Sequence, residues 1–166
     1  MARLALVGLP GVGKTTIARL LGDEWGCGSL DTDDLVSVAV GCPASEYLRR
    51  EGLAAFRRAE LDALRTALDG DGVVSTGGGV VTTSAARELL QASVTLWLDC
   101  DDAVLCARLG AVDRPLIGAD VHAALTQLRR ERATLYAEVA RARIDASGDP
   151  DVVARRVQDA SNEGAR

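Results

Sequence analysis

The sequence predicts an α/β fold in which helices cover both faces of a parallel β-sheet, and three observations lead to this class. Five short, mostly apolar runs are separated by longer stretches with helical periodicity, and strands that alternate with helices form parallel sheets. The first run, RLALV, is nearly continuous in apolar residues, as strands buried on both faces are. No internal repeat and no linker divides the chain, so residues 1–166 are predicted to form one domain.

Each element is predicted from its own local pattern. The predicted strands are short runs with apolar centres: RLALV at 3–7, GSLD at 28–31, GVVST at 72–76, VTLWLD at 94–99 and ARID at 142–145. The predicted helices carry apolar residues on one side: about 14–25, a broken region interrupted by GCP at 41–43, 53–69, 84–90, 101–109, 120–140 and from 149 onward. Ser84 is expected to cap its helix, and the tail at about 161–166 is expected to be frayed.

Composition narrows the class of protein. Hydrophobic residues make up 48% and charged residues 26% of the chain, which indicates a folded globular protein. A net charge of −5 argues against a nucleic-acid or membrane-surface binder, because such proteins normally carry a basic face. No apolar run is long enough to span a membrane. Four cysteines without C-x-x-C spacing and a single histidine argue against a zinc site and favour reduced thiols, so we expect a cytoplasmic protein.

The stretch GLPGVGKT at 8–15 carries the most specific signal. Gly8, Gly13, Lys14 and Thr15 match the pattern G-x-x-x-x-G-K-[ST], and they lie between a predicted strand and a predicted helix, as a phosphate-binding P-loop requires. Glycines let backbone N–H groups point at phosphate oxygens, the lysine reaches the β- and γ-phosphates, and the threonine hydroxyl binds Mg²⁺. Lys14 is the only lysine beside 18 arginines, and a bulkier guanidinium would not fit the same loop.

A P-loop alone indicates a nucleotide and leaves several enzyme classes open. A GTPase needs the guanine-reading sequence N-K-x-D, which this chain cannot contain because its one lysine lies in the P-loop. Motors and GTPases also normally need a longer chain. The strand GVVST runs into Ser75 and Thr76, where a P-loop ATPase would carry an aspartate. A small-molecule kinase is therefore the favoured class.

Two further stretches place polar groups at the carboxyl ends of predicted strands, on the same edge of the sheet as the P-loop. Asp31 and Asp33 follow the second strand. Such acids hold hydrated Mg²⁺ or accept a proton from an acceptor hydroxyl, and they also cap helices. Gly77, Gly78 and Gly79 follow the third strand. They either let a ligand approach the backbone closely or form a plain turn, and the pattern leaves both alternatives open.

Three arginines are notable for their setting. Arg57 has Glu60 three residues later on a predicted helix, a spacing at which the two side chains pair. Arg114 lies in the glycine-flanked loop GAVDRPLIG, and Arg132 lies on the long predicted helix. Each alone is a candidate surface residue. Together they suit a carboxylate and a transferring phosphoryl group, because guanidinium groups bind both with two parallel hydrogen bonds.

In order and spacing, these stretches resemble the shikimate kinase family over about residues 4–145. The shared stretches are GLPGVGKT at 8–15, LDTD at 30–33, FRRAE at 56–60, GGG at 77–79, RPLI at 114–117 and RATLY at 132–136. The resemblance implies a three-layer P-loop kinase fold: a five-stranded parallel sheet flanked by helices, a small acceptor-binding helical segment at about 33–60 and a lid at about 108–119.

The resemblance also implies a role for each matching residue. For ATP it implies a phosphate cradle and an adenine side, formed by Gly11, Val12, Gly13, Lys14, Thr15, Thr16, Arg108 and Pro150, with Arg114 closing over the transferred phosphoryl group. For Mg²⁺ it implies a direct contact from Thr15 and contacts through water from Asp31 and Ser75. For the acceptor it implies Asp33 as base, Arg57 and Arg132 as carboxylate ligands, and a pocket lined by Gly77, Gly78 and Gly79. Lys14, Asp33 and Arg114 are the implied catalytic residues.

The implied reaction is transfer of the ATP γ-phosphoryl group to the 3-hydroxyl of shikimate, with ATP and Mg²⁺ required. The implied partners are small molecules, and we expect a monomer that binds neither nucleic acid nor membrane. Two alternatives stay open at this point. One is a kinase of the same fold that acts on another cyclic polyol or sugar acid, and the other is a nucleotide-binding regulatory module without transfer. The presence of Asp33 together with Arg57 and Arg132 argues against the second alternative.

Overall fold

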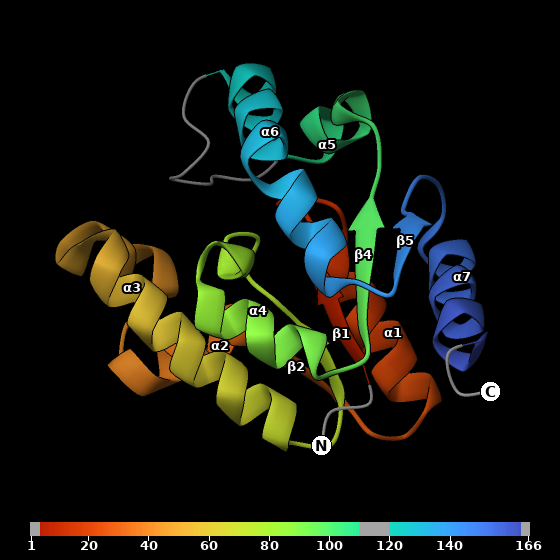
Figure 1. The fold of residues 1–166 in the computed structure, drawn as a ribbon, viewed down its shortest axis with the longest axis horizontal. Helices are drawn as coiled ribbons and strands as arrows, with labels where there is room; N and C mark the ends of the chain where they lie inside the picture. Colours follow the sequence, from red (N-terminus) through yellow and green to blue (C-terminus); the bar gives the residue numbers. More distant parts are fainter. Residues whose placement is uncertain (1–3, 110–119, 164–166) are drawn as a thin grey trace.

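A five-stranded parallel β-sheet forms the centre of the structure, as the sequence predicts (Figure 1). The computed structural model describes residues 4–109 and 120–163. The strands are β1 (Leu4–Val7), β2 (Ser29–Asp31), β3 (Val73–Ser75), β4 (Thr95–Asp99) and β5 (Ala142–Asp145). Their order across the sheet is β2-β3-β1-β4-β5, and every neighbouring pair is parallel. The segments that follow the strands therefore meet at one edge of the sheet.

Helices flank the sheet (Figure 1). They are α1 (Lys14–Glu24), α2 (Thr32–Val40), α3 (Ala44–Asp69), α4 (Ser84–Gln91), α5 (Asp102–Leu109), α6 (Val121–Val139) and α7 (Pro150–Glu163), with a short 3₁₀ helix, η1 (Val80–Thr82). Helix α1 packs beside α7, α4 packs between α3 and α6, and α5 packs beside α6. No helix within the described ranges is long and apolar enough to cross a membrane.

The apolar runs that predict the strands form the core. All four residues of β1 are buried, and the strand lies in the middle of the sheet between β3 and β4. All five residues of β4 are also buried. Leucine and valine side chains from these strands pack with those of the flanking helices in one large cluster. This rigid centre holds the loops at the carboxyl edge of the sheet in place.

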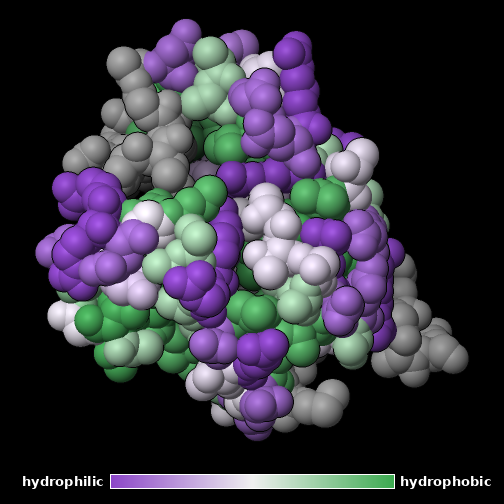
Figure 2. All heavy atoms as spheres, turned by 60° about the vertical axis from the view of Figure 1, so that its left-hand side comes forward, coloured by the Kyte–Doolittle hydropathy of each residue, from purple (hydrophilic) through white to green (hydrophobic). Residues whose placement is uncertain are grey.

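The α2–α3 segment has a small apolar core of its own. Val36, Phe56 and Ala63 are buried together there. The predicted interruption at 41–43 is confirmed, because α2 ends at Val40 and α3 begins at Ala44. Within α3, Gly52 has φ 83° and ψ 171°, a backbone conformation essentially restricted to glycine. On the face that Figure 2 shows, hydrophilic side chains are interspersed with hydrophobic ones.

Two local expectations differ from the structure. The N-cap of α4 is Thr83 rather than Ser84, and no side chain bonds to the first turn of this helix. The extended backbone of Thr83, with φ −96° and ψ 124°, is typical of an N-cap, so Ser84 is already the first helical residue. Helix α7 continues through Glu163, so the first part of the tail expected to be frayed is helical. Most of the expected lid, residues 110–119, and the last residues, 164–166, lie outside the described residues.

Candidate active site

The loop between β1 and α1 has the backbone of a phosphate-binding loop. Gly8, Gly11 and Gly13 have φ values of 147°, 79° and 105°, which favour glycine over any other residue. A Cβ atom on Gly11 would come within 2.7 Å of the Leu109 side chain. Gly13 is the N-cap of α1, and no side chain bonds to the first turn of the helix. The N–H groups of this turn are thus left for an anion.

Lys14 is the first residue of α1 and is only 7% exposed. Its Nζ atom donates hydrogen bonds to the carbonyl oxygens of Gly8, at 2.9 Å, and of Leu9, at 3.0 Å. The ammonium group is therefore held over its own loop, where a bound phosphate would meet both the charge and the N–H groups. A lysine fits this position because its compact charge is carried on a flexible stem.

Three oxygen-bearing side chains meet beside the P-loop. The Thr15 hydroxyl donates to Asp31 Oδ2 at 2.8 Å and lies 3.1 Å from the Ser75 hydroxyl. Asp31 also caps α2, because its Oδ1 accepts from the Asp33 N–H at 2.9 Å. The metal-binding and capping interpretations of Asp31 are thus compatible, since each uses a different carboxylate oxygen. Hard oxygen ligands of this kind suit Mg²⁺, which keeps several waters and also binds substrate phosphates.

No group of three or more His, Cys, Asp or Glu side chains that could hold a metal ion is found in the described ranges. Thr15, Asp31 and Ser75 therefore fit Mg²⁺ only as a site completed by water and nucleotide, which is the usual arrangement for this ion.

Two cavities lie next to the P-loop. The first, of about 240 Å³, brings together most of the residues expected to bind phosphate, metal and acceptor. Its lining includes Gly11, Gly13, Lys14, Thr15, Thr16, Asp31, Asp33, Ser75, Gly77, Gly78 and Arg108. The second, of about 310 Å³, is lined by Val12, Arg108, Gly148 and Pro150 among others. Residues of the P-loop and Arg108 line both cavities.

Arg108 is held in place by two backbone carbonyl groups. Its guanidinium donates to the Val12 carbonyl at 3.1 Å and to the Ala146 carbonyl at 3.1 Å. It therefore ties the P-loop to the segment between β5 and α7, and it lines both cavities. Pro150 also lines the second cavity. Both residues expected on the adenine side thus meet the P-loop there.

On the acceptor side, Arg57 and Glu60 form the ion pair that their spacing predicts. Arg57 Nη1 donates to Glu60 Oε2 at 2.5 Å. Glu60 is only 2% exposed, and burial raises the pKa of its carboxyl, whereas the nearby guanidinium of Arg57 and that of Arg132 lower this pKa and Asp33 raises it. These four charged groups are close enough to influence one another, although they come from three separate elements.

The three glycines after β3 make room for this cluster. A Cβ atom on Gly77 would come within 2.5 Å of Glu60 Oε1 and 3.1 Å of Asp33 Oδ1. One on Gly79 would overlap the Arg57 guanidinium. The glycine turn is therefore more than a plain turn: the side chains of Glu60, Asp33 and Arg57 occupy the space that a Cβ atom would need.

Arg132 and Tyr136, both on α6, lie beside this cluster. Arg132 is 9% exposed, and its buried Nε has no hydrogen-bond partner among the described residues. Tyr136 is 1% exposed and its hydroxyl donates to the Gly78 carbonyl at 2.5 Å. Burial raises the pKa of Tyr136 to about 12, and Arg132 partly opposes this shift. Tyr136 lies in the RATLY stretch, but no sequence pattern predicts its contact with the glycine turn. The catalytic residue expected at Arg114 lies outside the described residues.

Comparisons with known proteins agree with this geometry. A family model described as shikimate kinase matches residues 10–161. The chain is 38% identical to a shikimate kinase of Mycobacterium tuberculosis, over 93% of this chain and 90% of the relative. It is also 38% identical to one of Streptomyces avermitilis, over 95% and 94%. A shikimate kinase from Acinetobacter baumannii, solved in complex with shikimate, superimposes with a TM-score of 0.90 at 27% identity, covering 98% of this chain and 94% of that one. The chain belongs to the shikimate kinase family.

Proposed function

We propose that this protein transfers the γ-phosphoryl group of ATP to the 3-hydroxyl of shikimate and requires Mg²⁺. The observation that carries the acceptor assignment is Arg132, a buried guanidinium whose Nε has no partner in the described structure. A buried donor of this kind is costly unless a ligand pairs with it. Arg57 and Arg132 both lie close enough to Glu60 to lower the pKa of its carboxyl, and Asp33 lies near the same carboxyl. The two guanidinium groups suit an acceptor with a carboxylate, because each can bind it with paired hydrogen bonds.

The nucleotide side of the reaction uses the P-loop. Its glycines and the first turn of α1 present N–H groups to the phosphates, and Lys14 moves from its own loop carbonyls to the β- and γ-phosphates. Thr15 would bind Mg²⁺ directly, and Asp31 and Ser75 would hold it through water. A bound Mg²⁺ would neutralise charge on the phosphates. Arg108 and Pro150 border the space for adenine.

On the acceptor side, Asp33 lies between the two substrates. It lines the cavity of about 240 Å³ that P-loop residues also line. It also lies near Glu60 and the glycine turn. A carboxylate in this place accepts the proton of the acceptor hydroxyl as the oxygen attacks phosphorus. Arg57 and Arg132 hold the acceptor carboxylate, and the backbone of Gly77, Gly78 and Gly79 lines the pocket. We also propose, from the RPLI match alone, that Arg114 closes over the transferred phosphoryl group.

The direct test is ADP release by the purified protein with shikimate and with a panel of hydroxy acids and cyclic polyols. We expect rapid release with shikimate, dependence on Mg²⁺, and a product phosphorylated at the 3-position by phosphorus NMR. Faster release with another member of the panel would overturn the acceptor assignment. No acceptor-dependent release at all would overturn phosphoryl transfer and leave a nucleotide-binding module.

We further propose that the enzyme acts as a monomer in the cytoplasm. All four cysteines are free thiols, which suits a reducing compartment. The large apolar side chains exposed in the described ranges are the scattered Val38, Leu53 and Val152, and scattered apolar residues do not form an interface. Light scattering after size exclusion tests the oligomeric state, and a dimer mass would contradict it.

A further inference from the structure

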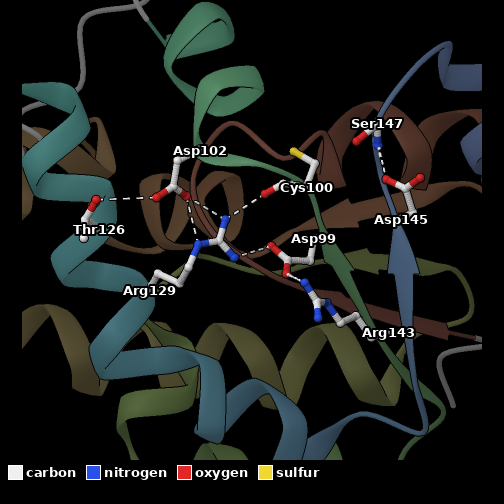
Figure 3. Close-up of polar contacts among 8 residues, drawn as sticks. All are labelled: Asp99, Cys100, Asp102, Thr126, Arg129, Arg143, Asp145 and Ser147. Atoms are coloured by element: carbon white, nitrogen blue, oxygen red, sulfur yellow. Dashed lines mark hydrogen bonds and ion pairs between the residues drawn. The ribbon is translucent and has the colours of Figure 1, made fainter.

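Arg129 lies on α6, three residues before the RATLY stretch, and all three nitrogens of its guanidinium donate hydrogen bonds. Its Nε donates to Asp102 Oδ1 at 2.8 Å, its Nη1 to Asp99 Oδ1 at 2.7 Å, and its Nη2 to the Cys100 carbonyl at 2.7 Å. Figure 3 shows the guanidinium between these acceptors, with Asp102 on one side and Asp99 on the other. Every nitrogen of the group is used.

The partners of Arg129 belong to a different part of the chain from α6. Asp99 ends β4 and is 2% exposed, and Asp102 begins α5. The Arg129 side chain itself is 27% exposed. Because one carboxylate is buried and the guanidinium has hydrogen bonds on all sides, this contact is more rigid than an exposed ion pair. It fixes one point of α6 to the carboxyl end of a central strand.

A second contact fixes α6 further along. The hydroxyl of Tyr136 donates to the Gly78 carbonyl in the glycine turn. Arg129, Arg132 and Tyr136 are spaced by three and four residues, so they lie on one face of the helix. At 1.5 Å per residue, Arg132 lies about 4.5 Å along the axis from Arg129 and about 6 Å from Tyr136. The acceptor-side arginine is therefore between two anchors, one on β4 and one on the glycine turn.

We propose that Arg129 is a positioning residue for the acceptor: together with Tyr136 it sets the rotation and height of α6 so that Arg132 faces the acceptor carboxylate. The inference rests on the proposed function in one respect, because it takes a carboxylate as the ligand of Arg132. Nothing in the described structure bonds to Arg132 Nε, so the direction of that donor depends on where the helix is held.

Arg143 provides a matched control. It contacts the other oxygen of the same carboxylate, Asp99 Oδ2, at 2.6 Å, and its guanidinium lies 5.0 Å from the centre of the Trp97 ring. It comes from β5 rather than α6 and its side chain is 64% exposed. Replacing it removes one cation from Asp99, as replacing Arg129 does, but leaves the attachment of α6 unchanged.

The experiment measures kcat and KM for shikimate and for ATP in Arg129→Met, Arg129→Lys and Arg143→Met, each alone and combined with Arg132→Ala. We expect Arg129→Met to lower kcat/KM for shikimate about tenfold, the size of an ordinary coupling between neighbouring groups, with KM for ATP within twofold. Arg129→Lys should recover part of the loss, because it keeps the charge. Arg143→Met should stay within twofold for both substrates. In the Arg132→Ala background, Arg129→Met should cost less than twofold, because the residue acts through Arg132.

Three results would overturn the inference: no loss in Arg129→Met, equal losses in Arg129→Met and Arg143→Met, or the same loss with and without Arg132. If Arg129→Met does not fold, as judged by circular dichroism, Asp102→Asn replaces it and should show a smaller loss that also disappears in the Arg132→Ala background. A loss that persists there would overturn the inference equally. Failure of the proposed function is distinguishable, because the unaltered protein would then show no turnover with shikimate.

Discussion

The proposed phosphate cradle and the proposed acceptor pocket of this protein are built in opposite ways. The cradle comes from one continuous stretch, residues 8–16, with three glycines of positive φ and a lysine that contacts its own loop. The acceptor pocket combines residues from α2, α3, the turn after β3, and α6, which side-chain contacts hold together. A local loop can be transferred between proteins as a unit, whereas a pocket assembled from four elements depends on the whole fold.

This difference separates two functional statements. The cradle indicates that a nucleoside triphosphate binds, and such loops are common to many enzyme classes. In the proposed function, the pocket determines which acceptor receives the phosphoryl group, because its charges select a ligand of matching shape and charge. Substitutions in the cradle should therefore affect the chemical step with any acceptor, and substitutions in the pocket should affect one acceptor more than another.

The largest effect is expected from the cradle. We expect Lys14→Ala to lower kcat by about a thousandfold or more, because the developing charge on the phosphates loses its fixed cation. The fold should be unchanged by circular dichroism. Lys14→Arg serves as the control that keeps the charge, and it should also be nearly inactive, because the guanidinium is too bulky for a loop in which the lysine is only 7% exposed. Turnover above a tenth of normal in Lys14→Ala would refute the P-loop assignment.

A smaller effect, confined to the acceptor, is expected from the arginines. Arg57→Ala or Arg132→Ala should weaken shikimate binding by about 2–5 kcal/mol, because a desolvated carboxylate loses a partner. KM for ATP should stay within twofold. The exposed neighbours Arg58 and Arg130 are matched controls, and their alanine variants should bind shikimate normally by calorimetry. Normal binding by both pocket variants would mean that the acceptor is recognised elsewhere.

The same contrast explains how far sequence analysis succeeds. The strands and the P-loop are predicted from consecutive residues, and the structure contains them where the patterns place them. The pairing of Arg57 with Glu60 is also local, since it spans one helical turn, and it is confirmed. The contact between Tyr136 and Gly78 joins residues 58 positions apart, and the helical pattern around Tyr136 indicates only a core residue. The reason for three glycines at 77–79 likewise emerges only when Glu60 and Arg57 are seen beside them.

Glu60 is expected to have an intermediate effect. Glu60→Gln should raise KM for shikimate about tenfold, because Arg57 loses the charged partner that orients it. Burial raises the pKa of this carboxyl above 4.5 in the folded state, so its contribution to stability is greatest below that pH and is lost as pH rises through the raised pKa. The free energy of unfolding of the wild type, measured with denaturant, should therefore fall relative to that of Glu60→Gln as pH rises from about 4.5.

A control for Glu60→Gln comes from the same helix. Glu51 pairs with Arg50 at 2.8 Å, and both side chains are exposed. Glu51→Gln should change neither KM nor the pH dependence, because exposed pairs contribute little. Unchanged KM in Glu60→Gln, with a stability curve parallel to that of the wild type, would show that Glu60 does not orient Arg57.

The smallest effect at neutral pH is expected from Tyr136→Phe, which removes one hydrogen bond and should cost about 1 kcal/mol of stability. The difference should change sign in strong alkali. Burial raises the pKa of Tyr136 from 10.0 to about 12, so its contribution is complete below pH 10 and is lost between about pH 10 and 12. Over that window the wild type should lose about 2–3 kcal/mol relative to the variant. Parallel unfolding curves across this range would place the Tyr136 hydroxyl in contact with water.

The proposed function requires that the assembled pocket recognises its acceptor by a carboxylate. The most direct measurement compares kcat/KM for shikimate with that for its carboxamide, which has nearly the same shape but no charge, in the unaltered enzyme. We predict that the carboxamide loses about 2–5 kcal/mol of transition-state binding, a factor of at least about 30, while KM for ATP is the same with both acceptors. Equal kcat/KM values for the two compounds would show that Arg57 and Arg132 do not recognise the charge of the acceptor.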